Sequence, residues 1–503
     1  MMHWRAEPVP TPSRSRRSKP ATPPAPPARP ARPASPGQSF AVRCLAMAVA
    51  ALLTANGVIV AEQVSKRDLI TLSSDGLSNA REAIARLLGD KKDKGPVAAG
   101  TVLDQSSTTT TTAAPAVEGS TTSTTVALAP TPVVPAPGAP TASTAPPKTT
   151  TTTAKKAPSG GGTDWNHVAE TIRPYIEKET SLPFTGPVTV TALDTDAFNA
   201  RLDTVRMAPA LDRARRAEAT LKALGIIDPN VNLADQVKRL STGSVTAFYD
   251  VKANELVIRN GQLTPFMLKT IVHELVRADY DQHFELDRPS LVAPDDESGV
   301  AWDSLVEGTA SRIEARFVSA LPDADKKSVQ AEQQRIAGQL PSDLPDYVLV
   351  EYAFPFGSGP KFADYLMNNG GAARVNAAFQ HPPTTTEQII HPEKFVAGEG
   401  PKAMANPTAD APAIRSGSLG QLMISLMLAQ VVDPSQAETA ADGWGADRFV
   451  AWQNGGQTCV RLSIDMDTPD KLTAMGQALA NWAKGTPGAT IQGSGPFTVN
   501  RCV

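Results

Sequence analysis

Apolar and polar positions follow two different periods in the later part of the chain, which predicts both helices and strands there. Residues 188–193 alternate as a half-buried strand does. Residues 245–250 and 255–259 are two further β-prone runs with a short polar connection between them, and this arrangement predicts a hairpin. Helical spacing of apolar residues predicts helices over residues 165–180 and 208–224.

Thr264 and Pro265 mark the start of another helix, because threonine is a good N-cap and proline is favoured at the first helical position. Nearer the C-terminus, residues 448–465 read as strand, NGG turn and strand, followed by a helix over residues 469–484 and a last strand that reaches Cys502. We therefore expect an α+β domain with small β-sheets over residues 164–503, with a possible C-terminal subdomain at 415–503.

The most continuous apolar run lies much earlier, and residues 40–61 are predicted to be a transmembrane signal-anchor. Residues 44–61 are interrupted only by Thr54, Asn56 and Gly57. As a helix this run is ~27 Å long, which is close to the thickness of the hydrocarbon core of a bilayer. A cleaved signal peptide whose apolar part ends near residue 55 is the alternative. Both readings place the rest of the chain outside the cytoplasm.

Composition describes the segments around this run. Residues 1–39 are rich in proline and arginine, which predicts a disordered basic arm on the cytoplasmic side. Residues 62–96 have helical spacing and are expected to form a juxtamembrane helix. Residues 97–163 are rich in threonine and proline and read as an extended linker, or stalk. We thus expect a single-pass protein of the cell membrane with an extracytoplasmic C-terminal domain.

Charge and cysteine content agree with that location. The formal net charge of −3 is too small to indicate nucleic acid as a partner. Cys459 and Cys502 are the two cysteines outside the apolar run, and in an oxidising compartment they are expected to form a disulfide. Two buried free thiols are the alternative.

Candidate chemistry lies in the helix that begins at Thr264. His273 and Glu274 are followed by Arg277, one helical turn after the histidine. In the HExxH pattern two histidines at this spacing bind zinc, and the glutamate acts as general base on a metal-bound water. Arginine keeps its proton and has no lone pair to donate, so it cannot replace a histidine ligand.

Three motifs in order carry a resemblance to a known family. They are YDVKANELVIRNGQLTPFMLKTIVHELVRADYDQHFEL, LVEGTASRIEARFV and PPTTTEQIIHPEKF. Together they resemble a group of actinobacterial HExxH zinc metallopeptidase-like proteins of the gluzincin type, over roughly residues 164–503. The family pattern has HELTHALQDQHF where this chain has Arg277 in place of the second histidine. It has VEGDA where this chain has Thr309 in place of the aspartate.

The resemblance implies a zincin-like fold with a helical active-site region, and it implies roles for particular residues. His273 would be a metal ligand, Glu274 a relict general base, and Glu307 the third ligand, from a second helix. We expect Arg277 to pair with Glu307 or Glu274, so that a fixed positive charge stands where the cation once did. The expected cofactor is therefore none, or weakly bound zinc.

Other polar residues have competing readings. His283 could rescue coordination, but along a continuous helix it lies ~15 Å beyond His273, so local packing or bonding is favoured. Glu307, Ser311 and Glu314 form a polar stripe that is either a solvated face or, from the family position, part of the cleft. The prolines of residues 382–395 predict a rigid loop, and neither His381 nor His391 is expected to be a ligand. Residues 354–357 and 368–371 read as turn and packing signals.

Three functions remain open from the sequence. The first is a membrane-tethered, catalytically impaired metallopeptidase-like protein that binds a peptide or an envelope protein. The second is an active metallopeptidase that uses His273, Glu307 and a non-standard ligand. The third is a passive structural surface module on a stalk. Whether the chain is an enzyme thus stays uncertain, although Arg277 favours an inactive protein.

Overall fold

The computed structural model describes residues 163–241, 245–288, 296–341 and 343–503. The predicted arm, membrane anchor, juxtamembrane helix and linker lie outside these residues. Among the helices that are described, none combines the length and the apolar character needed to cross a bilayer.

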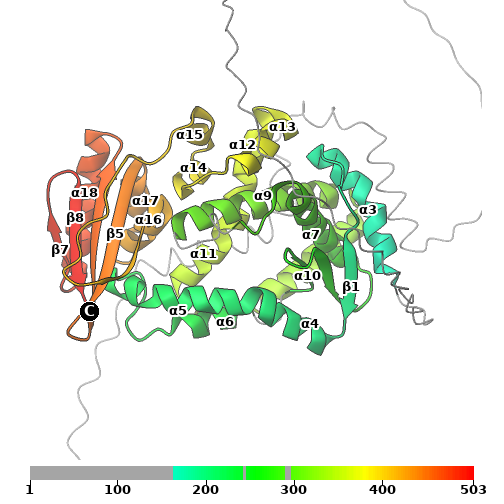
Figure 1. Ribbon diagram of the computed structural model, residues 1–503, viewed down its shortest axis with the longest axis horizontal. Helices are drawn as coiled ribbons and strands as arrows, with labels where there is room; N and C mark the ends of the chain where they lie inside the picture. Colours follow the sequence, from blue (N-terminus) through cyan, green and yellow to red (C-terminus); the bar gives the residue numbers. More distant parts are fainter. Residues whose placement is uncertain (1–162, 242–244, 289–295, 342) are drawn as a thin grey trace, which may run out of the picture. The chain divides into compact units, whose positions relative to one another are not determined.

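The described chain is a mixed α+β structure with two separate small sheets (Figure 1). Its elements follow one another in this order: α3 (Trp165–Thr180), β1 (Thr189–Leu193), α4 (Thr195–Leu202), the π-helix η1 (Asp203–Met207), α5 (Ala208–Ala223), α6 (Leu233–Ser241), β2 (Ala247–Asp250), β3 (Glu255–Arg259), α7 (Pro265–Phe284), α9 (Asp296–Ala320), α10 (Asp323–Ala337), α11 (Asp346–Gly357), α12 (Gly359–Asn368), α13 (Gly371–Gln380), α14 (Thr386–Ile390), α15 (Pro392–Ala397), β4 (Ala413–Gly417), α16 (Gly420–Ala429), α17 (Pro434–Ala441), β5 (Trp444–Asn454), β6 (Gln457–Met466), α18 (Pro469–Gly485), β7 (Thr490–Gln492) and β8 (Phe497–Cys502).

The first sheet has the strand order β1-β3-β2. The predicted hairpin is confirmed as β2 and β3, which pair antiparallel. β1 joins β3 in parallel, a pairing that the sequence pattern did not predict. The faces of β3 alternate, since Leu256 and Ile258 pack into the core around α7 while Val257 packs against Phe198 of α4. The strand order places β2 at one edge of this sheet, and β2 lies next to α7.

The central helix α7 begins where Thr264 and Pro265 predict. The Thr264 side chain accepts a hydrogen bond from the backbone N–H of Met267 at 3.1 Å, which satisfies one of the free donors of the first turn. The helix is buried along most of its length, with both apolar and polar residues inaccessible to solvent. It packs against α3, α9 and strand β2 (Figure 1). Its polar residues His273, Glu274 and Asp279 are among the buried ones.

Helix α9 lies against α7 on one side and α12 on another. It passes very close to the start of α12, because a Cβ built on Gly308 would stand 2.2 Å from the carbonyl carbon of Gly359. Only glycine allows two backbones to approach in this way. The contact fixes the depth and rotation of α9 beside Glu307, the neighbouring residue.

The first turns of α9 contact the C-terminal part of the chain. Glu297 is buried and accepts a hydrogen bond from the Thr386 hydroxyl at 2.9 Å. Gly420, at the start of α16, has a φ of +71°, and a Cβ there would overlap the carboxylate of Glu297. Glycine is required at this position for both reasons. Glu297 therefore joins α9, α14 and α16 at one point.

The second sheet has the order β4-β5-β6-β8-β7 and is antiparallel throughout. The predicted strand, turn and strand are β5 and β6, and the predicted helix is α18. Cys459 and Cys502 stand directly opposite each other on β6 and β8, and they form the expected disulfide. The bond joins the last strand to the centre of the sheet.

Two local predictions were wrong. The proline-rich region at 382–395 is not a plain rigid loop but carries the short helices α14 and α15. Thr385 caps α14 and Pro392 occupies the first turn of α15, so these residues start helices there. Residues 354–357 are not a turn but the last turn of α11, with Pro355 inside the helix. The turn expected at 368–371 is present between α12 and α13.

Candidate functional site

The polar residues of α7 and α9 meet between the two helices. His273, Glu274 and Arg277 come from α7, and Glu307 and Glu314 come from α9. Their side chains keep only 5 to 17 % of their accessible surface. The stripe on α9 is therefore not a solvated face, because Ser311 and Glu314 are buried and Glu307 is nearly so.

The imidazole of His273 lies between two carboxylates. Its Nδ1 is 3.0 Å from Glu314 Oε2, and its Nε2 is 3.0 Å from Glu307 Oε2. Ionised carboxylates only accept hydrogen bonds, so both ring nitrogens must donate, which requires the protonated imidazolium. Burial opposes this charge, but the hydrogen bonds to Glu307 and Glu314 outweigh it and raise the pKa of His273 to about 9.

Glu307 is the residue that His273 and Arg277 share. Arg277 Nη1 lies 3.2 Å from Glu307 Oε1, while His273 contacts the other carboxylate oxygen. Burial alone would favour the neutral acid, but the charge of Arg277 and the hydrogen bond from His273 hold the pKa of Glu307 far below its usual range. The carboxylate thus stays ionised between two cations.

Glu274 lies on the other side of Arg277. Its Oε2 accepts a hydrogen bond from the backbone N–H of Tyr249 at 2.9 Å, and it forms longer ion pairs with Arg206 Nη2 at 3.5 Å and Arg277 Nη1 at 3.6 Å. The expected pairing of Arg277 is therefore found with both acids, Glu307 and Glu274. Tyr249 belongs to edge strand β2, so the carboxylate also ties α7 to the sheet.

Glu314, on α9, is the second carboxylate that contacts His273. Lys269 Nζ lies 2.8 Å from Glu314 Oε1. Burial raises the pKa of Glu314, but the charge of Lys269 and the hydrogen bond from His273 together outweigh burial and lower it. The carboxylate orients the imidazole through Nδ1, in the manner of the outer partners that hold histidines in place. The sequence had placed Glu314 in a polar stripe without a role, and its helical spacing from Glu307 was the available signal.

Arg206 and Tyr249 were not anticipated at the site. Arg206 belongs to the short π-helix η1, far from α7 in sequence, and its side chain is 35 % exposed. Such π-helical insertions often occur at functional sites. Nothing in the local pattern around residue 206 indicates its contact with Glu274, because that contact depends on the long-range packing of η1.

The remaining candidates fall outside this cluster. His283 Nε2 lies 2.8 Å from the carbonyl oxygen of Pro183, which is far away in the sequence, and 3.8 Å from Asp279 Oδ1 on its own helix. His391 faces Asp442, the residue that follows α17, with its Nε2 3.0 Å from Asp442 Oδ1. Thr309 is buried, and its hydroxyl has no hydrogen-bond partner among the described residues. It does not take over the role of an outer acceptor, which Glu314 performs for His273.

The zinc that the family resemblance implies does not fit the residues present. His273 Nε2 and Glu307 Oε2 are close enough to bind one ion together. This pair alone therefore does not exclude a zinc ion. The third donor is lacking, because the guanidinium of Arg277 has no lone pair. Its charge, 3.2 Å from Glu307, also repels a dication. In the parts of the chain that are described, no three histidine, cysteine or acidic residues are grouped to hold a metal.

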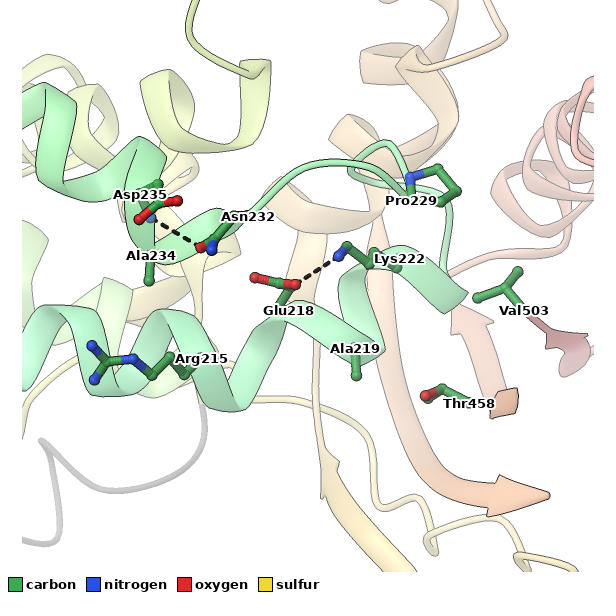
Figure 2. A pocket seen from close by; sticks show the side chains of 10 residues that line it. All are labelled: Arg215, Glu218, Ala219, Lys222, Pro229, Asn232, Ala234, Asp235, Thr458 and Val503. Carbon is green, nitrogen blue, oxygen red and sulfur yellow. Dashed lines mark hydrogen bonds and ion pairs between the residues drawn. The ribbon is translucent and has the colours of Figure 1, made fainter. Parts of the chain in front are cut away.

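A separate pocket of about 670 Å³ lies between α5, the start of α6 and the end of the second sheet (Figure 2). Two of its charged side chains, Glu218 and Lys222, pair with each other. Lys222 Nζ is 2.6 Å from Glu218 Oε1, and the other oxygen of Glu218 accepts from the backbone N–H of Leu233. The pocket shares no residue with the α7–α9 cluster.

Comparison with known families gives a match at the C-terminal end. The family described as a domain of unknown function (DUF8575) matches residues 410–501. This region covers the second sheet, from β4 to β8, together with α16, α17 and α18. It is less than a fifth of the chain and excludes α7 and α9. No curated protein and no solved structure matched the chain.

Proposed function

We propose that this chain is a membrane-anchored, extracytoplasmic protein with a zincin-like domain that has lost ordinary metallopeptidase chemistry and binds a peptide or protein of the cell envelope. One observation carries the proposal, the ion pairs of Arg277 with Glu274 and Glu307. In the family pattern these two carboxylates serve a metal-bound water and the metal. Here a guanidinium of permanent charge lies within ion-pair distance of both.

The state of His273 supports the same proposal. A histidine ligand must be neutral at the nitrogen that binds metal. His273 instead donates to carboxylates through both nitrogens, and its raised pKa keeps it protonated at neutral pH. Binding of a metal would require removal of that proton and displacement of Arg277 from Glu307. The active-metallopeptidase alternative is disfavoured for these two reasons.

Metal analysis of the purified full-length chain tests the proposal. We expect the wild-type protein to contain far less than one zinc per chain after dialysis against micromolar zinc. Arg277→His supplies the missing nitrogen donor one turn from His273, and this variant is expected to bind about one zinc per chain. Arg312→His, a change of the same type on α9 outside the cluster, is the matched control and should remain metal-free.

Two outcomes would contradict the proposal. Stoichiometric zinc in the wild-type protein that disappears in His273→Ala would refute the loss of the metal site. A folded Arg277→His variant without zinc would instead show that α7 and α9 do not present a zincin-like ligand geometry.

A further inference from the structure

The loop between α3 and β1, residues 181–188, is fastened to the last turn of α7. Gln282 Oε1 accepts a hydrogen bond from the backbone N–H of Thr185 at 2.9 Å. The next residue, His283, has its Nε2 2.8 Å from the carbonyl oxygen of Pro183. A carbonyl oxygen only accepts hydrogen bonds, so this nitrogen carries a proton that it donates to Pro183. Two neighbouring side chains of α7 therefore hold the loop.

A buried acid lies next to this contact. Asp279 stands one turn before His283 on α7, and its side chain is fully buried. Among the described residues, neither of its carboxylate oxygens has a hydrogen-bond partner of good geometry. The Thr180 hydroxyl is close to the carboxylate, but its single proton is donated to the carbonyl oxygen of Ile176 at 3.0 Å. Ionisation of a buried carboxylate without donors is costly, so the neutral acid is favoured.

The charged groups around Asp279 come from α7 and α3. Burial raises the pKa of Asp279 to about 6, and the nearby Thr180 and the charge of His283 oppose this rise. From α3, Glu177 raises the pKa further and Arg173 lowers it. These two side chains lie 4.0 Å apart, so their opposite charges partly cancel at Asp279. Asp279 therefore changes its charge near pH 6, well above the range of an ordinary aspartate.

The N–H group at His283 Nε2 has two acceptors near it. The carbonyl oxygen of Pro183 is 2.8 Å from this nitrogen, and Oδ1 of Asp279 is 3.8 Å from it. While Asp279 is neutral, the carbonyl oxygen is the nearer acceptor and keeps the proton. An ionised carboxylate is a stronger acceptor than a carbonyl, and here it has no other donor of good geometry among the described residues. A small rotation of the imidazole toward Asp279 then satisfies the carboxylate and frees Pro183.

We propose that Asp279 and His283 form a pH-dependent catch, which holds the loop of residues 181–188 on α7 in acid and releases it when Asp279 ionises. The catch involves neither metal nor ligand at the α7–α9 cluster, so it goes beyond the proposed function. The loop leads directly into β1, the edge strand that pairs with β3, and its release therefore loosens that edge of the first sheet. In the proposed extracytoplasmic location, the catch would respond to the pH outside the cell.

Hydrogen exchange of the purified full-length chain tests the proposal. Exchange of the amides in residues 181–188 is followed by mass spectrometry at about pH 5 and about pH 7.5, and each rate is divided by the rate of an unstructured peptide at the same pH. The pKa of Asp279 is raised by folding from 3.8 to about 6, so its contribution is full in acid and is lost as pH rises through 6. Since one pKa unit corresponds to a tenfold change in an equilibrium, we expect protection to fall at least about tenfold between the two conditions.

Variants connect that response to the catch. Asp279→Asn keeps the shape of the side chain but cannot ionise, so the loop should stay protected at both pH values. His283→Ala removes the donor, and the loop should be poorly protected at both. Asp346→Asn is the matched control, because burial also raises the pKa of Asp346 to about 6 but this residue begins α11 and has no part in the contact. It should leave the response of the loop unchanged. Thermal melting of each variant shows that the fold is retained.

The outcomes separate the catch from the proposed function. Equal protection of the wild-type loop at both pH values, or a response that Asp279→Asn retains, would overturn the catch even if the protein is metal-free. A response that Asp346→Asn also abolishes would overturn it as well, since it would then reflect the stability of the whole fold. Stoichiometric zinc in the wild-type chain would overturn the proposed function and leave the catch intact.

Discussion

Removal of the Arg277 charge should destabilise the folded protein markedly. Arg277→Met keeps much of the side-chain volume but leaves Glu274 and Glu307 without the cation between them. These carboxylates are only 6 % and 17 % exposed, so water replaces the lost partner poorly. Two unit charges ~4 Å apart attract by roughly 4 kcal/mol at an effective dielectric constant of ~20. The desolvation of the guanidinium offsets part of this attraction.

Breaking a buried ion pair by removing one partner typically costs about 3–5 kcal/mol. Because Glu307 keeps some contact with solvent, we expect a loss near the lower end, about 3 kcal/mol in the free energy of unfolding at pH 7. The measurement is denaturant unfolding followed by tryptophan fluorescence. The double variant Arg277→Met with Glu307→Gln should recover part of the loss, since it removes one uncompensated carboxylate.

Arg312 provides the matched control on the neighbouring helix. Its ion pair with Asp364 is short, at 2.6 Å, but Asp364 is 56 % exposed. Arg312→Met should therefore cost no more than about 1 kcal/mol. If Arg277→Met also costs less than about 1 kcal/mol, or if the double variant is less stable than Arg277→Met alone, Arg277 does not hold the two carboxylates together.

Three further predictions concern the packing, protonation and covalent link described above. Gly308→Ala places a methyl group against the backbone of Gly359, so it should lower the melting temperature; an unchanged melting temperature would contradict the close contact. The pKa of His273 is raised by folding from 6.5 to about 9, so its stabilising contribution is full below about pH 6.5 and is lost as pH rises through 9. Melting curves should show a decline of roughly 3 kcal/mol over that range in the wild-type protein, and His273→Gln should lack it. Reduction of the Cys459–Cys502 bond, which closes a loop of 43 residues in sequence separation, should cost about 2–4 kcal/mol, and a melting curve insensitive to reductant would argue against that role.

The sequence predicted local elements well where capping and periodicity act together. Thr264 and Pro265 located the start of α7, and the NGG turn located the hairpin of β5 and β6, because these signals depend on backbone conformation within a few residues. The parallel pairing of β1 with β3 could not be predicted in this way, since it depends on contacts across many residues.

The same distinction holds for the candidate site: residues close together in the sequence were predicted, and contacts between distant segments were not. His273, Glu274 and Arg277 were identified because their spacing on one helix is visible in the sequence. Glu307 came from the family resemblance, and its contact with His273 and Arg277 is seen only in the folded chain. Arg206 approaches the cluster from a π-helix about seventy residues earlier, and no periodic signal links the two segments.

One continuous helix, α9, carries both Glu297 and Glu307, so the two residues are mechanically coupled. Glu297, near its first turn, is fastened to α14 and lies against α16, whereas Glu307 stands ten residues later, ~15 Å along the same axis. An α-helix is stiff over such a length. At Gly308 the helix is in close contact with Gly359 at the start of α12. A displacement of Glu307 would therefore be transmitted along α9 to Glu297, and from there to α14 and to α16, which lies in the region that the DUF8575 family model matches.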